Sequence, residues 1–349
     1  MSSVFTYLLY FLYACIGVTM SLFVLSPIVP RFSFYARLLA SHLALLVCAA
    51  YGLVASIVLR AVGYGRVSQW ATARCFRLVM RLCTGVEVEV QGKEHLKTRP
   101  AVFIANHQSE LDVLVLGATF PPYCSVTAKK SLKKVPFLGW FSVLSLDPTL
   151  EIHADSWSPV ALSRTVFIDR SNRENAMAAF ADAASEMREE KQSVYIFPEG
   201  TRSYYAQPDL LPFKKGAFHL AIQAKVPIVP VVVANYASVL HVPSSIFRSG
   251  TLYVKGKNCP GLRVSAVLTR NFAVLPPIPT ANFSASDVDH LTKSTRDLML
   301  KELVEFSNTT PAVGLDSSLK SSQAVDGVIK STGVEFGRRH VDGQVAPTT

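Results

Sequence analysis

The stretch Asn106-His107-Gln108-Ser109-Glu110-Leu111-Asp112 follows the apolar run 101–105 and leads into a second apolar segment, 113–116. An apolar run of about five residues, a polar turn and a second apolar segment together predict a buried strand whose end passes into a helix. Sheets built from such units place their chemistry where the strands end. The stretch therefore predicts an α/β fold, with a candidate site at this polar turn.

The spacing of His107 and Asp112 permits a catalytic pair on one condition. Residues five apart on a regular helix point about 140° away from each other, so the two side chains meet only if His107 lies in the turn and Asp112 on the first helical turn. Asp112 would then keep one imidazole nitrogen protonated and leave the other free to accept a proton. The run Ser109-Glu110-Leu111-Asp112 also fits a capping box. Taken alone, these residues leave both interpretations open.

The N-terminal part of the chain is apolar enough to enter a bilayer. The protein has 349 residues, 50% of them hydrophobic, and neither 4–29 nor 38–59 contains a charged residue. Each span reaches the roughly 20 residues that a helix needs to cross a membrane. A signal peptide is a poorer interpretation of the first span, because a basic n-region is missing. We expect residues 1–65 to form two membrane-spanning or membrane-inserted helices.

The charges around these spans predict topology and partners. No Asp or Glu precedes Glu87, whereas five arginines follow the second span. The positive-inside rule therefore puts the chain after residue 60 on the cytoplasmic side, and the arginines suit anionic lipid head groups. The net charge of +10 would also fit nucleic acid, but no nucleic-acid-binding module is recognisable, so membrane lipid is the expected partner and nucleic acid is not. The six cysteines show no metal-ligand spacing, and we expect no metal.

Apolar strand-like runs alternate with helical patterns after the spans, which predicts an α/β core. Pro230 inside the last of these runs predicts an edge strand or a bulge. We expect a catalytic domain at 66–308, whereas the Ser-, Gly- and Thr-rich residues 309–349 should be disordered. The expected strands are 86–91, 101–105, 123–128, 165–168, 193–197 and 228–234, and the expected helices are 174–190, 214–224 and 285–306.

Three of the expected strands end in polar sets: 106–112, Asp169-Arg170, and 199–203. If these strands are neighbours in one sheet, the three sets meet at one edge. A base, a carboxylate and two arginines suit the removal of a proton from a hydroxyl beside a phosphate. In that arrangement His107 is the base, and Arg170 and Arg202 are the phosphate ligands.

These blocks resemble the motifs of the membrane-bound glycerolipid acyltransferases, specifically the 1-acylglycerol-3-phosphate acyltransferases. Besides 106–112, the matching blocks are Phe167-Ile168-Asp169-Arg170, Phe197-Pro198-Glu199-Gly200-Thr201-Arg202-Ser203 and Val226-Pro227-Ile228-Val229-Pro230-Val231. The lysine-rich stretch 128–136 is also typical of the family. The resemblance covers residues 70–240 and implies a mixed sheet flanked by helices and preceded by two N-terminal membrane helices.

The resemblance implies acyl transfer from acyl-CoA, as co-substrate and with no cofactor, to the sn-2 hydroxyl of lysophosphatidic acid, giving phosphatidic acid. His107 would be the general base and Asp112 would orient it. An endoplasmic reticulum membrane, with the catalytic domain facing the cytosol, is the implied location. The residues implied to bind substrate are Glu199, Gly200, Thr201, Arg202 and Arg170, with Lys129 and Lys133 for CoA phosphates or membrane lipid.

Two segments depart from the family pattern, at 145–164 and at about 247–273, and each is either a surface loop or a translated intron. Two alternative functions stay open. One is a related acyltransferase that uses another acceptor, such as glycerol-3-phosphate or another lysophospholipid. The other is a catalytically impaired lipid-binding homologue. A serine hydrolase is a poorer interpretation, because the sequence has no Gly-x-Ser-x-Gly elbow.

Overall fold

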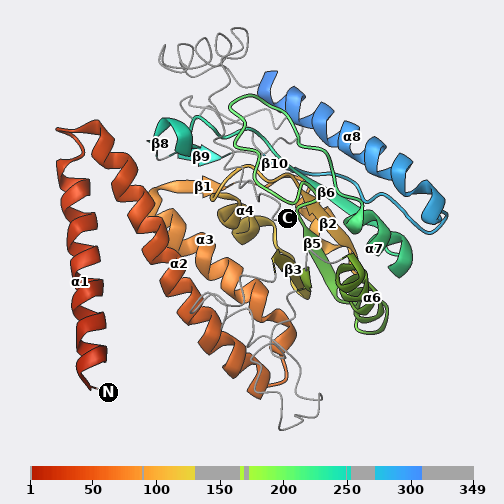
Figure 1. The fold of residues 1–349 in the computed structure, drawn as a ribbon, viewed down its shortest axis with the longest axis horizontal. Helices are drawn as coiled ribbons and strands as arrows, with labels where there is room; N and C mark the ends of the chain where they lie inside the picture. The colour runs from red at the N-terminus through yellow and green to blue at the C-terminus, as the bar shows by residue number, and fades with distance from the viewer. Residues whose placement is uncertain are drawn as a thin grey trace, which may run out of the picture. The chain divides into compact units, whose positions relative to one another are not determined.

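The computed structural model describes residues 2–88, 90–129, 166–168, 173–248, 250–252 and 272–308. It begins with two apolar helices, α1 (Ser2–Leu25) and α2 (Pro30–Ala61), which pack on each other (Figure 1). Among the described residues, α2 is the one helix long and apolar enough to cross a membrane, and a shorter apolar helix covers Leu9–Leu25 within α1. The expectation of two membrane helices is thus supported for one of them.

Helix α3 (Ser68–Thr84) packs along α2, and both helices contribute to the core of the protein. The Arg37 guanidinium of α2 donates to the carbonyl of Thr84 at the end of α3. Gly85 then ends α3 with a φ of 69°, a backbone conformation that glycine adopts without a side-chain clash. Buried side chains of α2 join those of α3 in one cluster. The core is therefore continuous across residue 65, where the membrane-helix segment was expected to end and the catalytic domain to follow.

The central sheet has six strands in the order β10-β6-β2-β5-β3-β4. All neighbours pair in parallel except β10, which runs antiparallel to β6. The expected mixed sheet is therefore present. Its three middle strands are buried along their whole length, as apolar runs without alternation predict for a sheet covered on both faces. The strands are β2 (Val102–Ala105), β3 (Cys124–Lys129), β4 (Val166–Ile168), β5 (Ser193–Ile196), β6 (Ile228–Val233) and β10 (Phe272–Val274).

Helices cover both faces of this sheet (Figure 1). Alternate residues of β2 separate the two layers: Phe103 packs in the cluster that holds α3 and α4, whereas Val102 and Ile104 pack in the cluster of α6, α7 and α8. The fold thus has three layers, with the sheet between two sets of helices. The helices are α4 (Asp112–Thr119), α6 (Arg173–Glu189), α7 (Gly216–Ala224) and α8 (Val288–Asn308).

Smaller elements complete the described chain. The two strands of a short parallel pair are β1 (Val86–Val88) and β9 (Gly250–Leu252), and an antiparallel pair joins β7 (Leu240–His241) to β8 (Ile246–Phe247). A 3-10 helix at Lys93–Lys97 precedes β2. The extra segment 145–164, most of 247–273, and the tail 309–349 lie outside the described residues.

The prediction that Pro230 marks an edge strand or a bulge is wrong in its first part, because β6 lies between β2 and β10. Its second part agrees with the structure, since the antiparallel register shifts by one residue at Pro230, from Val231 opposite Val274 to Ile228 opposite Ile278. Pro230 stands opposite Ile104 in a regular parallel register. The missing N–H of Pro230 would point to the same side of β6 as the N–H of Ile228, which bonds to the carbonyl of Ile278. On that side, Ile278 lies after the end of β10, whose pairing with β6 covers Phe272–Val274. A proline is tolerated here because no strand of the sheet requires a donor from it.

Candidate active site

The polar stretches 106–112 and 199–203 lie side by side because β2 and β5 are neighbouring parallel strands. The backbone continues their pairing beyond the strands. The N–H of Ser203 donates to the carbonyl of His107 at 2.9 Å, and the N–H of Tyr204 donates to the carbonyl of Gln108 at 3.1 Å. Two of the three expected strand ends therefore form one site at the carboxyl edge of the sheet.

His107 and Asp112 meet in the geometry that their spacing allows. His107 lies in the turn after β2, Asp112 is the first residue of α4, and His107 Nδ1 is 2.6 Å from Asp112 Oδ2. The ring of His107 stacks on Phe197, with 4.3 Å between centroids, and 22% of the His107 side chain is exposed. Because the carboxylate accepts the Nδ1 proton, Nε2 is the nitrogen left to accept a proton from a substrate.

The capping box expected at 109–112 is half formed. Asp112 Oδ2 accepts the N–H of Ser109 at 3.1 Å, which is the return bond of a capping box, and also the N–H of Gln108 at 2.7 Å. Ser109 Oγ bonds instead to the N–H of Leu111. One buried carboxylate thus both orders the start of α4 and orients His107, so the two interpretations do not compete.

Tyr236 belongs to this network, although no sequence motif pointed to it. Its hydroxyl donates to Asp112 Oδ1 at 2.7 Å and lies 3.0 Å from Ser109 Oγ. Burial, together with the charge of Asp112, holds the pKa of Tyr236 well above its ordinary value, so the phenol stays a donor. Tyr236 follows the end of β6, which neighbours β2, and the rule that sites form at strand ends was the available signal.

Two amides fasten the turn to β6. Asn106 exchanges two hydrogen bonds of 2.8 Å with the backbone of Val233, and Gln108 Nε2 donates to the carbonyls of Val233 and Ala234. These bonds satisfy buried polar groups and hold the backbone on both sides of His107.

Glu199 is buried, at 3% exposure, between two backbone donors. Its Oε1 accepts the N–H of His107 at 2.6 Å and its Oε2 accepts the N–H of Leu211 at 2.9 Å. Burial raises the pKa of Glu199 to about 7, while these two N–H groups act in the opposite direction. Its contacts in the described chain are therefore to backbone, and they fix the main chain at His107.

The other residues of this block lie nearer the surface. Gly200 has a φ of 71°, and a Cβ there would come within 2.9 Å of the Lys214 side chain. Thr201 is exposed. The Arg202 guanidinium is 3.0 Å from Glu110 Oε1, and its side chain is 42% exposed. A cation therefore borders the His107 stretch.

Three expected site residues cannot be placed at this edge. Strand β4 lies two positions from β5 in the sheet, with β3 between them, and Arg170 lies outside the described residues. Lys129 ends β3 opposite Ile168, and its side chain is outside the described set. Lys133 also lies outside it. Their roles stay predictions.

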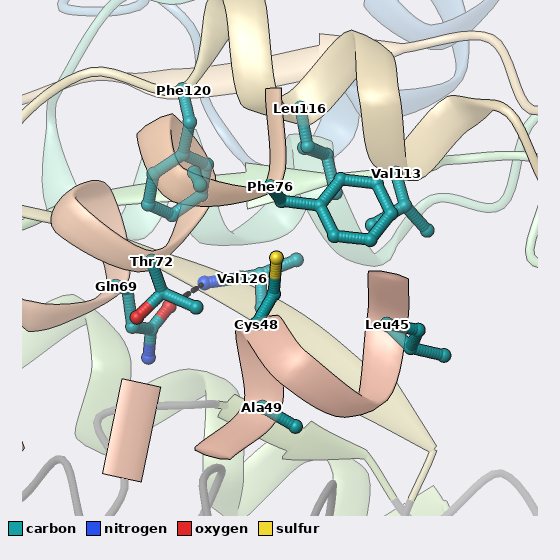
Figure 2. A pocket seen from close by; sticks show the side chains of 11 residues that line it. Leu45, Cys48, Ala49, Gln69, Thr72, Phe76, Val113, Leu116, Phe120 and Val126 are labelled. Atoms are coloured by element: carbon teal, nitrogen blue, oxygen red, sulfur yellow. Dashed lines mark hydrogen bonds between the residues drawn. The ribbon is translucent and has the colours of Figure 1, made fainter. Parts of the chain in front are cut away.

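An apolar cavity of about 150 Å³ lies between α2, α3, α4 and β3 (Figure 2). Val113, one residue after Asp112, is part of its wall, and Cys48 points into it from α2. Two polar side chains of the lining are hydrogen-bonded: Gln69 accepts the N–H of Val126 at 3.1 Å, and the Thr72 hydroxyl donates to the carbonyl of Ser68 at 2.9 Å. The cavity therefore places hydrocarbon-compatible space beside the helix that carries Asp112.

The site combines an oriented histidine with a bordering cation, an apolar cavity lies beside α4, and no group of metal-ligating side chains gathers within the described ranges. Residues 87–234 match the family model described as "Acyltransferase". The chain is 40% identical over 286 residues to the 1-acyl-sn-glycerol-3-phosphate acyltransferase of Saccharomyces cerevisiae, covering 82% of both chains. It therefore belongs to the acyltransferase family.

Within that family, the chain is similar to proteins that share a more specific name. It is 33% identical over 301 residues to human 1-acyl-sn-glycerol-3-phosphate acyltransferase beta, covering 85% of this chain and 94% of that one. The crystal structure of the 1-acyl-sn-glycerophosphate acyltransferase PlsC from Thermotoga maritima superimposes with a TM-score of 0.51 at 19% identity, over 83% of this chain and 96% of that one. That likeness establishes the fold.

Proposed function

We propose that the protein transfers an acyl group from acyl-CoA to the sn-2 hydroxyl of 1-acyl-glycerol-3-phosphate and so makes phosphatidic acid. The names of its relatives support the reaction. The observation that carries the proposal is the 2.6 Å contact between His107 Nδ1 and Asp112 Oδ2, which leaves Nε2 to act as a base.

The proposed chemistry is a direct transfer. His107 Nε2 takes the proton of the sn-2 hydroxyl while that oxygen attacks the thioester carbonyl carbon. The new C–O bond forms, the C–S bond breaks, and the imidazolium returns its proton to the leaving CoA sulfur. Asp112 stabilises the imidazolium, and Tyr236 holds the other oxygen of that carboxylate.

The acceptor phosphate is proposed to bind beside this base. Arg202 is the described cation nearest to the role, and its half-exposed ion pair with Glu110 is weak enough for a phosphate dianion to replace. Gly200 and Thr201 are proposed to contact the same phosphate, with Arg170 assisting. Glu199 acts there through the backbone of His107. Lys129 and Lys133 are proposed to bind the CoA phosphates or membrane lipid.

The acyl group is proposed to occupy the apolar cavity of Figure 2, which lies between α2, α3, α4 and β3. This arrangement lets a lipid substrate enter from the bilayer, with α1 and α2 both inserted in it. We place the protein in the endoplasmic reticulum membrane with the catalytic domain facing the cytosol, on the strength of the arginines that follow the second apolar span.

An acceptor panel with purified protein in neutral detergent tests this proposal. Release of CoA from acyl-CoA is measured with lysophosphatidic acid, glycerol-3-phosphate and lysophosphatidylcholine in parallel. We expect release that depends on lysophosphatidic acid and yields phosphatidic acid. Faster release with either of the other acceptors would assign a different acceptor, and no release with any of them would leave a lipid-binding protein without transferase activity.

A further inference from the structure

A strongly basic hollow lies apart from the site described above. Its volume is about 410 Å³, and it opens between α3, the 3-10 helix at Lys93–Lys97 and the segment that follows α4. We call it the basic pocket. The five cationic residues that line it are Arg74, Arg77, Lys93, Lys97 and Arg99.

The basic pocket and His107 lie at opposite edges of the sheet. Arg99 in its wall precedes β2, and Pro121-Pro122 in its wall precede β3. His107 instead follows the end of β2. Since β2 and β3 run parallel in one sheet, strand entries and strand exits lie a full strand length apart. A ligand in the basic pocket would therefore be separate from the proposed acceptor.

The arginines of the pocket are held in place by neutral groups. Arg74 donates to the carbonyls of Gly117, Ala118 and Phe120 at 3.1 to 3.3 Å, and Arg77 donates to the carbonyl of Val88 at 3.1 Å. Carbonyls fix the position of a guanidinium but do not cancel its charge. The two arginines are therefore pre-organised and still positively charged.

Arg99 is held in the same way. Its Nε donates to the carbonyl of Lys191 at 2.7 Å, and its guanidinium lies 3.8 Å from the centre of the Tyr123 ring. Within the described ranges, no ion pair joins any of the five cations to a carboxylate. The pocket thus concentrates positive charge with no ion-paired carboxylate from the part of the chain that the structure describes.

Electrostatics within the pocket agree with this geometry. Burial lowers the pKa of Arg74, and the charge of Arg77 lowers it further. Two guanidiniums that repel each other at a partly buried position gain from an anion placed between them. Lys93 and Lys97 are exposed at the rim, where they can close on the same anion.

The pocket also borders a surface suited to hydrocarbon. Leu78 and Leu82 on α3 are 57% and 75% exposed. Leu78 follows Arg77 directly and lies four residues after Arg74, so it stands beside the pocket on the same helix. An exposed apolar face flanked by fixed cations is the pattern of a helix at a membrane surface, with headgroups at the cations.

We propose that the basic pocket binds the phosphate headgroup of an anionic phospholipid of the surrounding bilayer, at a site separate from that of the acyl acceptor. Its acyl chains would lie along the exposed leucines of α3. The inference rests on the pocket and its apolar border and does not depend on which acceptor the enzyme uses.

Native mass spectrometry of the full chain in neutral detergent tests this site. Phosphatidylglycerol and phosphatidylcholine are added in equal amounts, and retained lipid is counted. We expect the wild type to retain phosphatidylglycerol preferentially. The Lys93→Ala/Lys97→Ala variant should lose that preference by about tenfold, because each lysine contributes separately to headgroup attraction. Lys97→Glu should lose at least as much.

A matched variant controls for the change in net charge. Lys293→Ala/Lys301→Ala removes two exposed lysines from α8 and should retain phosphatidylglycerol as the wild type does. Undiminished retention in Lys93→Ala/Lys97→Ala, or an equal loss in the α8 variant, would overturn the proposal. Inorganic phosphate is the last arm: if it displaces phosphatidylglycerol at equal concentration, the pocket recognises soluble phosphate and the lipid assignment is wrong.

Discussion

The two carboxylate oxygens of Asp112 accept hydrogen bonds from four donors at the centre of the site. Oδ2 accepts from His107, Gln108 and Ser109, and Oδ1 accepts from Tyr236. The carboxylate is 1% exposed, so these bonds replace the water that it would otherwise hold. Phe197 stacks on the imidazole ring of His107, and Glu199 accepts the backbone N–H of His107. These contacts, together with Asp112, hold the imidazole in one orientation.

Tyr236→Phe tests whether this network matters for turnover. The change removes the donor to Asp112 Oδ1 and keeps the ring volume, which should cost about 1 kcal/mol and lower kcat roughly three- to tenfold. KM for lysophosphatidic acid should stay unchanged, because the side chain is fully buried. Steady-state kinetics check both values. A raised KM at unchanged kcat would place Tyr236 in acceptor binding instead.

Glu199 should make stability depend on pH. Its pKa, raised to about 7 by burial, exceeds the ordinary value of 4.5, so the folded protein retains a proton that the unfolded chain releases. This contribution is fully present below pH 4.5 and is lost as pH rises through about 7.

Thermal unfolding of Glu199→Gln against wild type measures that effect. The variant places an amide donor against a backbone N–H and should lose about 1 to 3 kcal/mol at low pH. Because the amide does not titrate, its deficit should shrink as pH rises to 7. Parallel pH curves for the two proteins would show that Glu199 titrates normally.

At the level of elements, pattern alone predicted five of the six strands of the central sheet and most helices, because fully buried strands are continuous apolar runs. Strand β10 was not among the expected strands. The ends of β2 and β5 could be identified as site positions for the same reason. Strand order could not be predicted: it separates β4 from β2, puts Pro230 inside the sheet and brings Tyr236 to Asp112. The contacts that set this order join residues distant in sequence, and periodicity carries no information on them.

Gly117 sets how closely α4 approaches α3. A Cβ at this position would lie 2.9 Å from the carbonyl oxygen of Ala73 and 3.0 Å from Arg77 Cβ. Gly117→Ala should therefore push the helices apart, lower the free energy of unfolding by about 1 to 3 kcal/mol, and reduce turnover because α4 begins at Asp112.

Thermal unfolding and CoA release in detergent measure the two effects. Gly17→Ala is the matched control, since a Cβ there meets no atom within 4 Å. Equal stability of the two variants would mean that α3 and α4 adjust to the methyl group without strain.

At the scale of the whole molecule, α2 serves two environments. Its exposed side includes Val47, Tyr51 and Val54, while Phe34 and Cys48 lie in the core cluster with α3. The helix with the length to cross a bilayer is therefore also a wall of the apolar cavity. The sequence pattern predicted the apolar spans but not this packing. Both faces of α2 are apolar, so the pattern does not show which face contacts protein and which faces lipid.

Truncation separates the roles of the two N-terminal helices. Removal of residues 2–25 should leave a cooperatively folding protein, since most described side chains of α1 are exposed. Removal of residues 2–61 strips the cover from Phe76 and Met80 of α3 and opens the cavity, so folding should be lost. Thermal unfolding in detergent distinguishes the outcomes. A stable protein lacking α2 would contradict the continuous core.

His107 is proposed to act as the base of an acyl transfer. The most direct test of this role is the rate of lysophosphatidic-acid-dependent CoA release by wild type and His107→Ala, each checked for folding by its unfolding midpoint. Loss of general base catalysis predicts a fall of about a hundredfold or more in kcat with the fold intact. Normal turnover by a folded His107→Ala protein would show that His107 is not the base.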